Sequence, residues 1–201
     1  MSNHYYSENP TVESDRKTWE YKLRDFTLSF TTDAGVFSKN EIDFGSKVLI
    51  EAFEMPLVEG DVLDVGCGYG PIGITLAKQF QDRLIKMVDV NERALQLAKQ
   101  NAVQNEVDNI EIKKSDALKG LEKSDTFAAI LTNPPIRAGK KVVHEILETS
   151  YEHLVNGGEL WVVIQKKQGA PSAIDKLNEV FEEVEVVLKK KGYYIIKSKK
   201  G

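Results

Sequence analysis

From residue 60 onward, short apolar runs alternate with segments in which apolar residues recur every three or four positions. Runs of this length are typical of buried strands, and the wider spacing predicts helices with one apolar face. The pattern predicts strands at residues 61–65, 84–88, 110–113, 127–132 and 159–164, separated by helices at residues 71–80, 92–104, 140–154 and 172–181. Strands that alternate with helices favour a mostly parallel sheet covered on both faces.

The two ends of this pattern differ from its middle. Residues 184–188 and 193–197 are apolar runs separated by only four residues. Because this leaves no room for a crossover helix, the two runs predict an antiparallel hairpin. Near the start of the chain, apolar and polar residues alternate with period two on both sides of Arg24-Asp25, which predicts a second hairpin. A helix is expected at residues 43–53.

Together these elements predict an α/β fold with a Rossmann-like, mostly parallel sheet of seven strands. The sheet would end in a C-terminal antiparallel hairpin, carry helices on both faces and be preceded by a short N-terminal β-hairpin. We expect one domain at residues 19–201, made of the hairpin and first helix (19–58) and the core (59–201). Residues 1–18 are polar and lack periodicity, so they are expected to form an arm. Asn156-Gly-Gly158 predicts a turn before the strand at 159–164.

The composition, with 41% hydrophobic and 29% charged residues, is that of a globular domain. The longest apolar run, residues 160–164, is far too short to span a membrane, and the first residues show no signal-peptide pattern. We therefore expect a cytoplasmic protein without a membrane partner. The single cysteine, Cys67, excludes an internal disulfide and a cysteine-built zinc site, and no metal is expected.

The charge is unevenly distributed along the chain, whose net charge is −4. Residues 186–201 contain six lysines and no acid, and residues 133–141 contain Arg137, Lys140 and Lys141 without an acid. Basic segments are most often solvated surface. Two of them on one acidic protein can also form a local patch for nucleic acid, so RNA is the expected partner.

The first motif with chemical content is a glycine-rich loop that follows the strand at 61–65. Asp64 ends this strand region, and Gly66, Gly68 and Gly70 follow it with Cys67 between the first two. Glycines allow the backbone to turn sharply and to approach a ligand without a Cβ in between. At the carboxyl end of a strand in an α/β sheet, such a loop predicts a nucleotide-like cofactor.

Acidic residues follow the next two strands. Asp89 lies 23 residues after Gly66, and a carboxylate at this position can accept hydrogen bonds from both hydroxyls of a ribose. This suits NAD and S-adenosylmethionine equally. Asp116, after the third strand, lies where a side chain can reach an adenine amino group, although such a residue is also common as a helix cap or in a turn.

The motif that separates the two cofactors is Asn133-Pro134-Pro135, at the end of the strand at 127–132. Two prolines cannot continue a strand, and they leave carbonyl groups free to accept hydrogen bonds. The side-chain oxygen of Asn133 and the carbonyl of Pro134 can both accept from one amino group. This arrangement would hold a planar amine with its nitrogen facing an incoming methyl group, so that alignment supplies much of the rate.

In combination, Asp64-Val-Gly-Cys-Gly68, Asp89, Asp116 and Asn133-Pro-Pro resemble class I S-adenosylmethionine-dependent methyltransferases that modify amino groups. The chain is more closely similar to a small-domain family that includes the guanine-N2 methyltransferases of small-subunit ribosomal RNA. This similarity extends from Tyr21 to Lys200 and is carried by four segments, Gly35-Val-Phe-Ser38, Asp43-Phe-Gly45, Asn133–Lys140 and Trp161–Gln165.

The resemblance implies roles for individual residues. S-adenosylmethionine would be bound by the glycine loop and the following strand ends, that is by Asp64, Gly66, Cys67, Gly68, Gly70, Asp89, Val90, Asp116, Ala117 and Asn133. The target amine would meet Asn133, Pro134 and Pro135. Further substrate contacts would come from Phe37, Ile136, Arg137 and Lys140. Many relatives have an aromatic residue at the position of Ile136, so stacking on the target base would fall to Phe37.

Several functions remain open at this point. The same chemistry can act on adenine N6 of a nucleic acid or on a glutamine of a protein. An NAD(P)-dependent oxidoreductase would share the glycine loop and Asp89, but it does not account for Asn133-Pro-Pro. A non-catalytic RNA-binding or assembly factor would not need intact glycines and an intact Asn133. Some ribosomal RNA relatives also carry a second, duplicated domain, whereas only one is predicted here.

Overall fold

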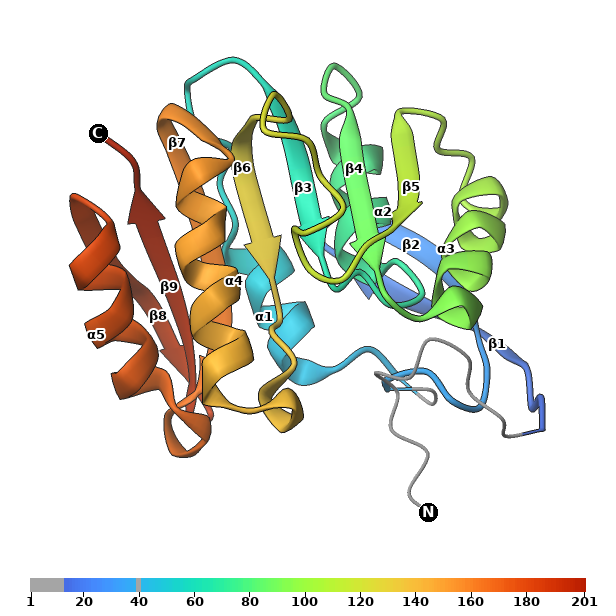
Figure 1. Ribbon diagram of the computed structural model, residues 1–201. Coiled ribbons are helices and arrows are strands. Elements are labelled where there is room, and N and C mark those ends of the chain that lie inside the picture. The colour runs from blue at the N-terminus through green and yellow to red at the C-terminus, as the bar shows by residue number, and fades with distance from the viewer. Residues whose placement is uncertain (1–12, 39–40) are drawn as a thin grey trace.

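A sheet of seven strands, in the order β5-β4-β3-β6-β7-β9-β8, forms the centre of the computed structural model, which describes residues 13–38 and 41–201 (Figure 1). Its strands are β3 (Asp61–Val65), β4 (Ile85–Asp89), β5 (Ile110–Lys114), β6 (Phe127–Thr132), β7 (Leu154–Gln165), β8 (Glu183–Lys190) and β9 (Tyr193–Lys199). The first five are parallel, and β9 pairs antiparallel with both β7 and β8. The predicted fold class is confirmed.

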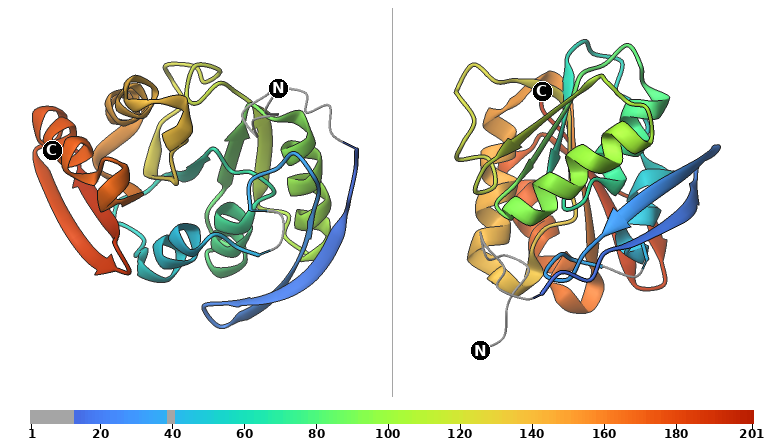
Figure 2. Two further views of the ribbon diagram at one scale, coloured as in Figure 1. Left: turned by 90° about the horizontal axis from the view of Figure 1, so that it is seen from below. Right: turned by 90° about the vertical axis from the view of Figure 1, so that its right-hand side faces the viewer.

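Helices cover both faces of the sheet, as Figure 2 shows. One face is covered by α1 (Phe44–Ala52), α2 (Pro71–Gln79) and α3 (Glu92–Gln104), and the other by α4 (Lys140–Glu152) and α5 (Ala170–Val180). Each face has its own cluster of buried apolar side chains. Two short 3₁₀ helices, η1 (Ile136–Ala138) and η2 (Lys166–Gln168), follow β6 and β7.

Strand β6 shows why the sequence reads as continuous apolar runs. All six of its residues are buried, because it lies in the middle of the sheet with helices on both sides. Its neighbour β3 is followed along the chain by β4 and β5 on one side of the sheet, whereas β7 to β9 lie on the other. The chain therefore changes direction between β3 and β6, and ligands bind at the carboxyl ends of the strands at such a point.

The N-terminal hairpin consists of β1 (Lys17–Leu23) and β2 (Phe26–Thr32) and lies on the α3 side of the sheet. Asn101 of α3 and Asn105, the C-cap of this helix, hydrogen-bond to the backbone of β2. Asn101 Oδ1 accepts from Thr31 N–H at 2.7 Å and its Nδ2 donates to the Thr31 carbonyl at 2.9 Å. Asn105 makes the same pair of bonds with Ser29, so the helix supplies the partner that a third strand would supply.

Two sequence-based boundaries are corrected by the structure. Strand β1 begins at Lys17, inside the segment 1–18 that was expected to be an arm, and residues 1–12 lie outside the described part. Asn156-Gly-Gly158 is not a turn before a strand but an irregularity within β7. There, the register against β6 passes from Leu154 opposite Phe127 to Glu159 opposite Ala129. Gly157 accommodates this bulge with a φ of +77°.

Candidate functional site

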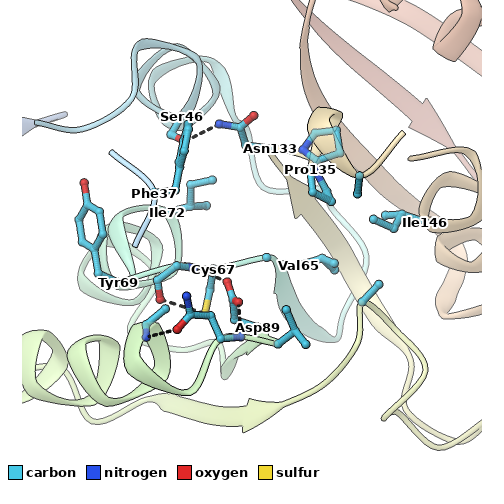
Figure 3. Close-up of a pocket in the computed structure, with 18 of the residues that line it drawn as sticks. Phe37, Ser46, Val65, Cys67, Tyr69, Ile72, Asp89, Asn133, Pro135 and Ile146 are labelled. Carbon is cyan, nitrogen blue, oxygen red and sulfur yellow. Dashed lines mark hydrogen bonds between the residues drawn. The ribbon is translucent and has the colours of Figure 1, made fainter. Parts of the chain in front are cut away.

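A cavity of about 470 Å³ opens at the carboxyl ends of β3, β4 and β6. Its walls come from the glycine loop, from the residues that follow β4, β5 and β6, and from the segment that leads into α1. Figure 3 shows that these walls bring together side chains far apart in the sequence, with Phe37, Ser46 and Asn133 near one another and Asp89 beside Cys67. The cavity therefore lies at the point where the topology predicts a ligand.

The glycine loop presents bare backbone to this cavity. Gly66 and Gly68 have φ values of +75° and +57°, and a Cβ built on either would meet no atom within 4 Å. Such a Cβ would project into open space, where a ligand can instead approach the backbone. Gly70 is different, because it does not line the cavity and its Cβ would lie 2.6 Å from Ile74 Cδ1. Gly70 is therefore needed for close packing at the start of α2.

Asp89 shapes the loop as well as facing the cavity. Its two carboxylate oxygens accept hydrogen bonds from the backbone N–H groups of Gly68 and Asn91, each at 2.8 Å. Burial raises the pKa of Asp89, and these backbone bonds act in the opposite direction. Since a carboxylate can accept about four hydrogen bonds, Asp89 retains capacity for ligand hydroxyl groups.

Asp64 is fully buried behind the glycine loop and does not line the cavity. Its Oδ2 accepts from the Gly73 N–H at 2.9 Å, whereas its Oδ1 has no hydrogen-bond partner among the described residues. Burial raises the pKa of Asp64 to about 7, and the bond from Gly73 opposes this rise. Asp64 therefore ties the loop to the first turn of α2 and holds one unsatisfied oxygen beneath it.

The remaining cofactor candidates line the cavity. Cys67 is buried, and burial raises the pKa of its thiol, so the sulfur is a small protonated side chain and not a nucleophile. Val90, Asp116 and Ala117 line the part formed by the ends of β4 and β5. The Asp116 carboxylate is exposed and pairs with Lys119 at 3.1 Å.

Asn133 is held in one orientation by two side chains that the sequence analysis did not assign. Its Nδ2 donates to Asp43 Oδ2 and to Ser46 Oγ, each at 2.9 Å. A carboxylate only accepts hydrogen bonds, so the amide nitrogen must face Asp43. The amide oxygen then points away from Asp43 and accepts no hydrogen bond from the described residues. It is left as an acceptor at the cavity wall.

A signal for Asp43 is present in the sequence. Asp43 is the N-cap of α1, and the same oxygen that holds Asn133 accepts from the Ser46 N–H at 3.0 Å. An Asp immediately before an apolar helical segment is a recognisable N-cap signal. The pattern predicts the cap, but not that a strand end 90 residues away would use the same carboxylate.

The predicted substrate residues divide into two groups. Phe37, Pro134 and Pro135 line the cavity, and Phe37 is 40% exposed. In Figure 3, Phe37 lies on the side of Ser46 and Ile72, with Pro135 and Ile146 on the other side. Ile136, Arg137 and Lys140 do not line the cavity. Ile136 packs against the apolar cluster below α4, and Arg137 and Lys140 are exposed beside the opening.

Residues 13–38 and 41–201 contain no group of three or more His, Cys, Asp or Glu side chains that could hold a metal ion. No helix in the same ranges is long and apolar enough to cross a membrane.

Comparison with known proteins gives these features a context. Residues 27–197 match the family described as "Methyltransferase small domain". The uncharacterized protein YbxB of Bacillus subtilis is 64% identical over 200 residues, which are all of both chains. Ribosomal RNA small subunit methyltransferase C of Actinobacillus pleuropneumoniae serotype 7 is 30% identical over 190 residues, covering 92% of this chain and 55% of that protein.

Solved structures show the same fold. A Thermus thermophilus 16S rRNA guanine-N2 methyltransferase, solved with S-adenosylmethionine and guanosine, superposes with a TM-score of 0.84 at 22% identity. The superposition covers 96% of this chain and 52% of that one. The chain therefore spans about half the length of the ribosomal RNA methyltransferases that it matches.

Proposed function

This chain belongs to the methyltransferase small domain family, and on that premise we propose that it transfers the methyl group of S-adenosylmethionine to an exocyclic amine, namely N2 of a guanine in small-subunit ribosomal RNA. The observation that carries the proposal is the fixed amide of Asn133, whose oxygen is left to accept from a donor in the cavity. An amine has N–H groups to donate. An acceptor at this place therefore selects an amine over a carbonyl or a phosphate.

The residues present suit S-adenosylmethionine. Gly66 and Gly68 leave room for a ligand against the backbone, and Asp89 can accept from ribose hydroxyls beside them. The unpaired Oδ1 of Asp64 leaves a hydrogen-bond acceptor beneath the loop that would hold this molecule. Val90, Asp116 and Ala117 offer one polar and two apolar side chains to an adenine.

The reaction requires orientation more than proton transfer. The amine nitrogen forms a bond to the methyl carbon as the carbon–sulfur bond breaks and its electron pair passes to sulfur. The nitrogen then carries an extra proton, becomes acidic and releases this proton to solvent. The Asn133 oxygen and the Pro134 carbonyl accept from the two N–H bonds and hold the nitrogen in line, which makes the attack nearly unimolecular. Pro134 and Pro135 stiffen this segment.

A base paired in a stem cannot present its amine to such a cavity, so the target nucleotide must be unpaired or rotated out of its stack. Phe37 offers the exposed aromatic ring at the cavity that a flipped base can stack on. We therefore propose that stacking falls to the loop before α1, and the packing of Ile136 against the α4 cluster supports this.

The oxidoreductase alternative loses its support. Family membership accounts for the glycine loop, Asp89 and Asn133 together. The Tyr-x-x-x-Lys spacing from Tyr193 to Lys197 lies on strand β9, not on a helix. Residues four apart on a strand are separated by roughly 13 Å, so these two side chains cannot form a one-turn catalytic pair.

The test is methyl transfer to small-subunit ribosomal RNA, followed by mass spectrometry of the nucleosides. We expect N2-methylguanosine as the product, and Asn133→Ala should lower the single-turnover rate by about 10²-fold, as when a positioned catalytic group is lost. Binding of S-adenosylmethionine to the variant should change little, because the amide faces the substrate side. If the methyl group is found on adenine or on a protein, the proposed reaction stands but the proposed substrate is wrong. A variant with the wild-type rate would overturn the role of Asn133.

A further inference from the structure

A band of lysines continues from the cavity along the same end of the sheet. We call it the basic edge, and it consists of Lys140, Lys141, Lys166, Lys167, Lys189, Lys190 and Lys191, all of them exposed. These lysines come from the start of α4, from η2 after β7, and from the end of β8 with its turn into β9. In Figure 1 these segments lie at the lower end of the molecule, where β3, β4 and β6 also end.

The topology explains why segments distant in the sequence meet here. Strands β6 and β7 are parallel, so the residues that follow them emerge at one edge. Strand β9 runs antiparallel to β7 with Tyr193 opposite Gln165, which returns the β8–β9 turn to the same edge. The Lys166 N–H donates to the Gly192 carbonyl at 2.8 Å. A contact of 3.1 Å between His144 Nε2 and Ser172 Oγ joins the first turns of α4 and α5.

Few acidic side chains lie near the ammonium groups of the basic edge, and one that acts on them is Glu179, whose pKa is lowered first by a hydrogen bond from Lys176 and also by the charge of Lys140. Residues 133–144, 160–174 and 186–201 contain no Asp or Glu. None of the seven lysines forms an ion pair within the described residues, whereas lysines on other surfaces, such as Lys86 and Lys176, do. Because the protein carries a net charge of −4, a patch of one sign does not follow from its overall composition. Concentrated positive charge of this kind attracts a polyanion.

Two of these lysines are positioned by aromatic rings. Lys191 Nζ lies 4.9 Å from the centre of the Phe44 ring, and Lys189 Nζ lies 4.8 Å from that of Tyr194. Phe44 and Tyr193 also contact each other, with ring centres 5.5 Å apart. Phe44 follows Asp43, the residue that holds the Asn133 amide. The basic edge therefore extends without a break to the wall of the cavity where the target amine is expected.

The opposite half of the same edge carries both signs. Asp89 ends β4, and Glu92 and Asp116 follow β4 and β5, with Lys114 paired to Glu92 and Lys119 to Asp116. These carboxylates suit a cationic cofactor, and their pairing with lysines leaves no run of unpaired ammonium groups for phosphates among the described residues there. The charges thus divide the opening into a cofactor side and a phosphate side.

We propose that the basic edge binds the phosphates of the RNA strand that flanks the target nucleotide, so that the strand leaves the cavity past Phe44 and runs over the ends of β7, β9 and β8. This inference rests on the proposed function, and it adds the surface and the direction of approach. Through the basic edge, a single domain can bind RNA beyond its cavity.

The experiment compares two triple variants with equal loss of charge. Lys166→Gln, Lys167→Gln and Lys190→Gln remove lysines of the basic edge that stack on no ring. Lys22→Gln, Lys99→Gln and Lys123→Gln remove three exposed lysines elsewhere, which also form no ion pair within the described residues. Binding of a fluorescein-labelled single-stranded oligoribonucleotide is measured by anisotropy over a range of NaCl concentrations. Calorimetry with S-adenosylmethionine shows whether each variant retains its fold.

Each phosphate contact on a single strand contributes about 0.7 to the slope of log affinity against log salt. The basic-edge variant should therefore lose about 2 from this slope and bind at least about tenfold more weakly at low salt. The control variant should keep the wild-type slope. Equal slopes for the two variants, or a wild-type protein that does not bind the RNA, would overturn the proposal. Methylation by the wild-type protein is measured separately. If N2-methylguanosine forms but the basic-edge variant keeps the wild-type slope, the proposed RNA-binding surface is wrong and the proposed function is not.

Discussion

Removal of the Asp43 carboxylate should impair methyl transfer through Asn133. In Asp43→Ala, the amide of Asn133 keeps its bond to Ser46 but loses the acceptor that fixes which end of the amide faces the cavity. A serine hydroxyl can donate or accept, so Ser46 alone does not distinguish the two ends. The amide can then rotate and present N–H groups to an amine that also donates.

The size of the effect follows from the bond that is lost. A hydrogen bond to a charged group contributes about 1.5–3 kcal/mol. If this whole contribution serves the transition state, the single-turnover rate falls about 10- to 150-fold. Asp43 also caps α1, and loss of an N-cap costs about 1 kcal/mol of stability, or about 2–4 °C in Tm for a chain of this size. Asp43→Asn keeps a good cap and a neutral acceptor, so it should melt like the wild type and lose only a few-fold in rate.

A double-mutant cycle separates the two roles of Asp43. We expect Asp43→Ala to slow methyl transfer in the wild type but to have no further effect on the rate in Asn133→Ala, because the amide that it positions is gone. The decrease in Tm should persist in both backgrounds, since the cap does not depend on Asn133. Additive effects on the rate would refute the idea that Asp43 acts through Asn133. An Asp43→Asn variant as slow as Asp43→Ala would count against it as well.

Four further variants concern the glycine loop and its carboxylates. Gly68→Ala should weaken S-adenosylmethionine binding by about tenfold or more, because its Cβ enters the cavity. Gly70→Ala should instead lower stability by about 1–3 kcal/mol, because its Cβ meets Ile74, and a reversed result in calorimetry and melting would contradict both assignments. Asp89→Ala should weaken cofactor binding by about 1–3 kcal/mol, since the Gly68 N–H also loses its acceptor; wild-type affinity would exclude Asp89 from the site. Burial raises the pKa of Asp64 to about 7, so the folded state holds a proton that the unfolded chain has released, and stability falls as pH rises toward 7. The Tm of Asp64→Asn relative to wild type should therefore increase between about pH 5 and pH 8, and a constant difference would show that Asp64 does not titrate there.

Much of the fold could be predicted because burial of the sheet between two layers of helices determines where apolar residues occur in the sequence. Strand β6 is covered on both faces, so every one of its residues is apolar or small, and its bounds of Phe127 and Thr132 agree with the prediction. The glycine loop could be placed because positive φ values and open space at Gly66 and Gly68 restrict the choice of residue.

The features that escaped prediction depend on contacts between distant segments. Asp43 and Asn133 are 90 residues apart, and the capping of α1 alone explains an Asp at that position. Gly70 has the same spacing as the loop glycines, but only the packing of Ile74 shows that it faces the core. Likewise, Asn156-Gly-Gly158 has the composition of a turn, and only its pairing with β6 shows a bulge.

Asn101 and Asn105, at the C-terminal end of α3, have a consequence for the order in which the molecule assembles. The hairpin β1–β2 is the first part of the described chain to be synthesised, yet its partners Asn101 and Asn105 come 70 and 76 residues after the backbone groups that they bind. Because an isolated two-stranded hairpin is marginally stable in water, this hairpin must wait for α3 before it is secure. Asn101 also donates to the carbonyl of Tyr69, at 2.8 Å, within the glycine loop. One side chain thus joins the glycine loop to the N-terminal hairpin, so a ligand that stabilises the loop should also slow amide hydrogen exchange in β2.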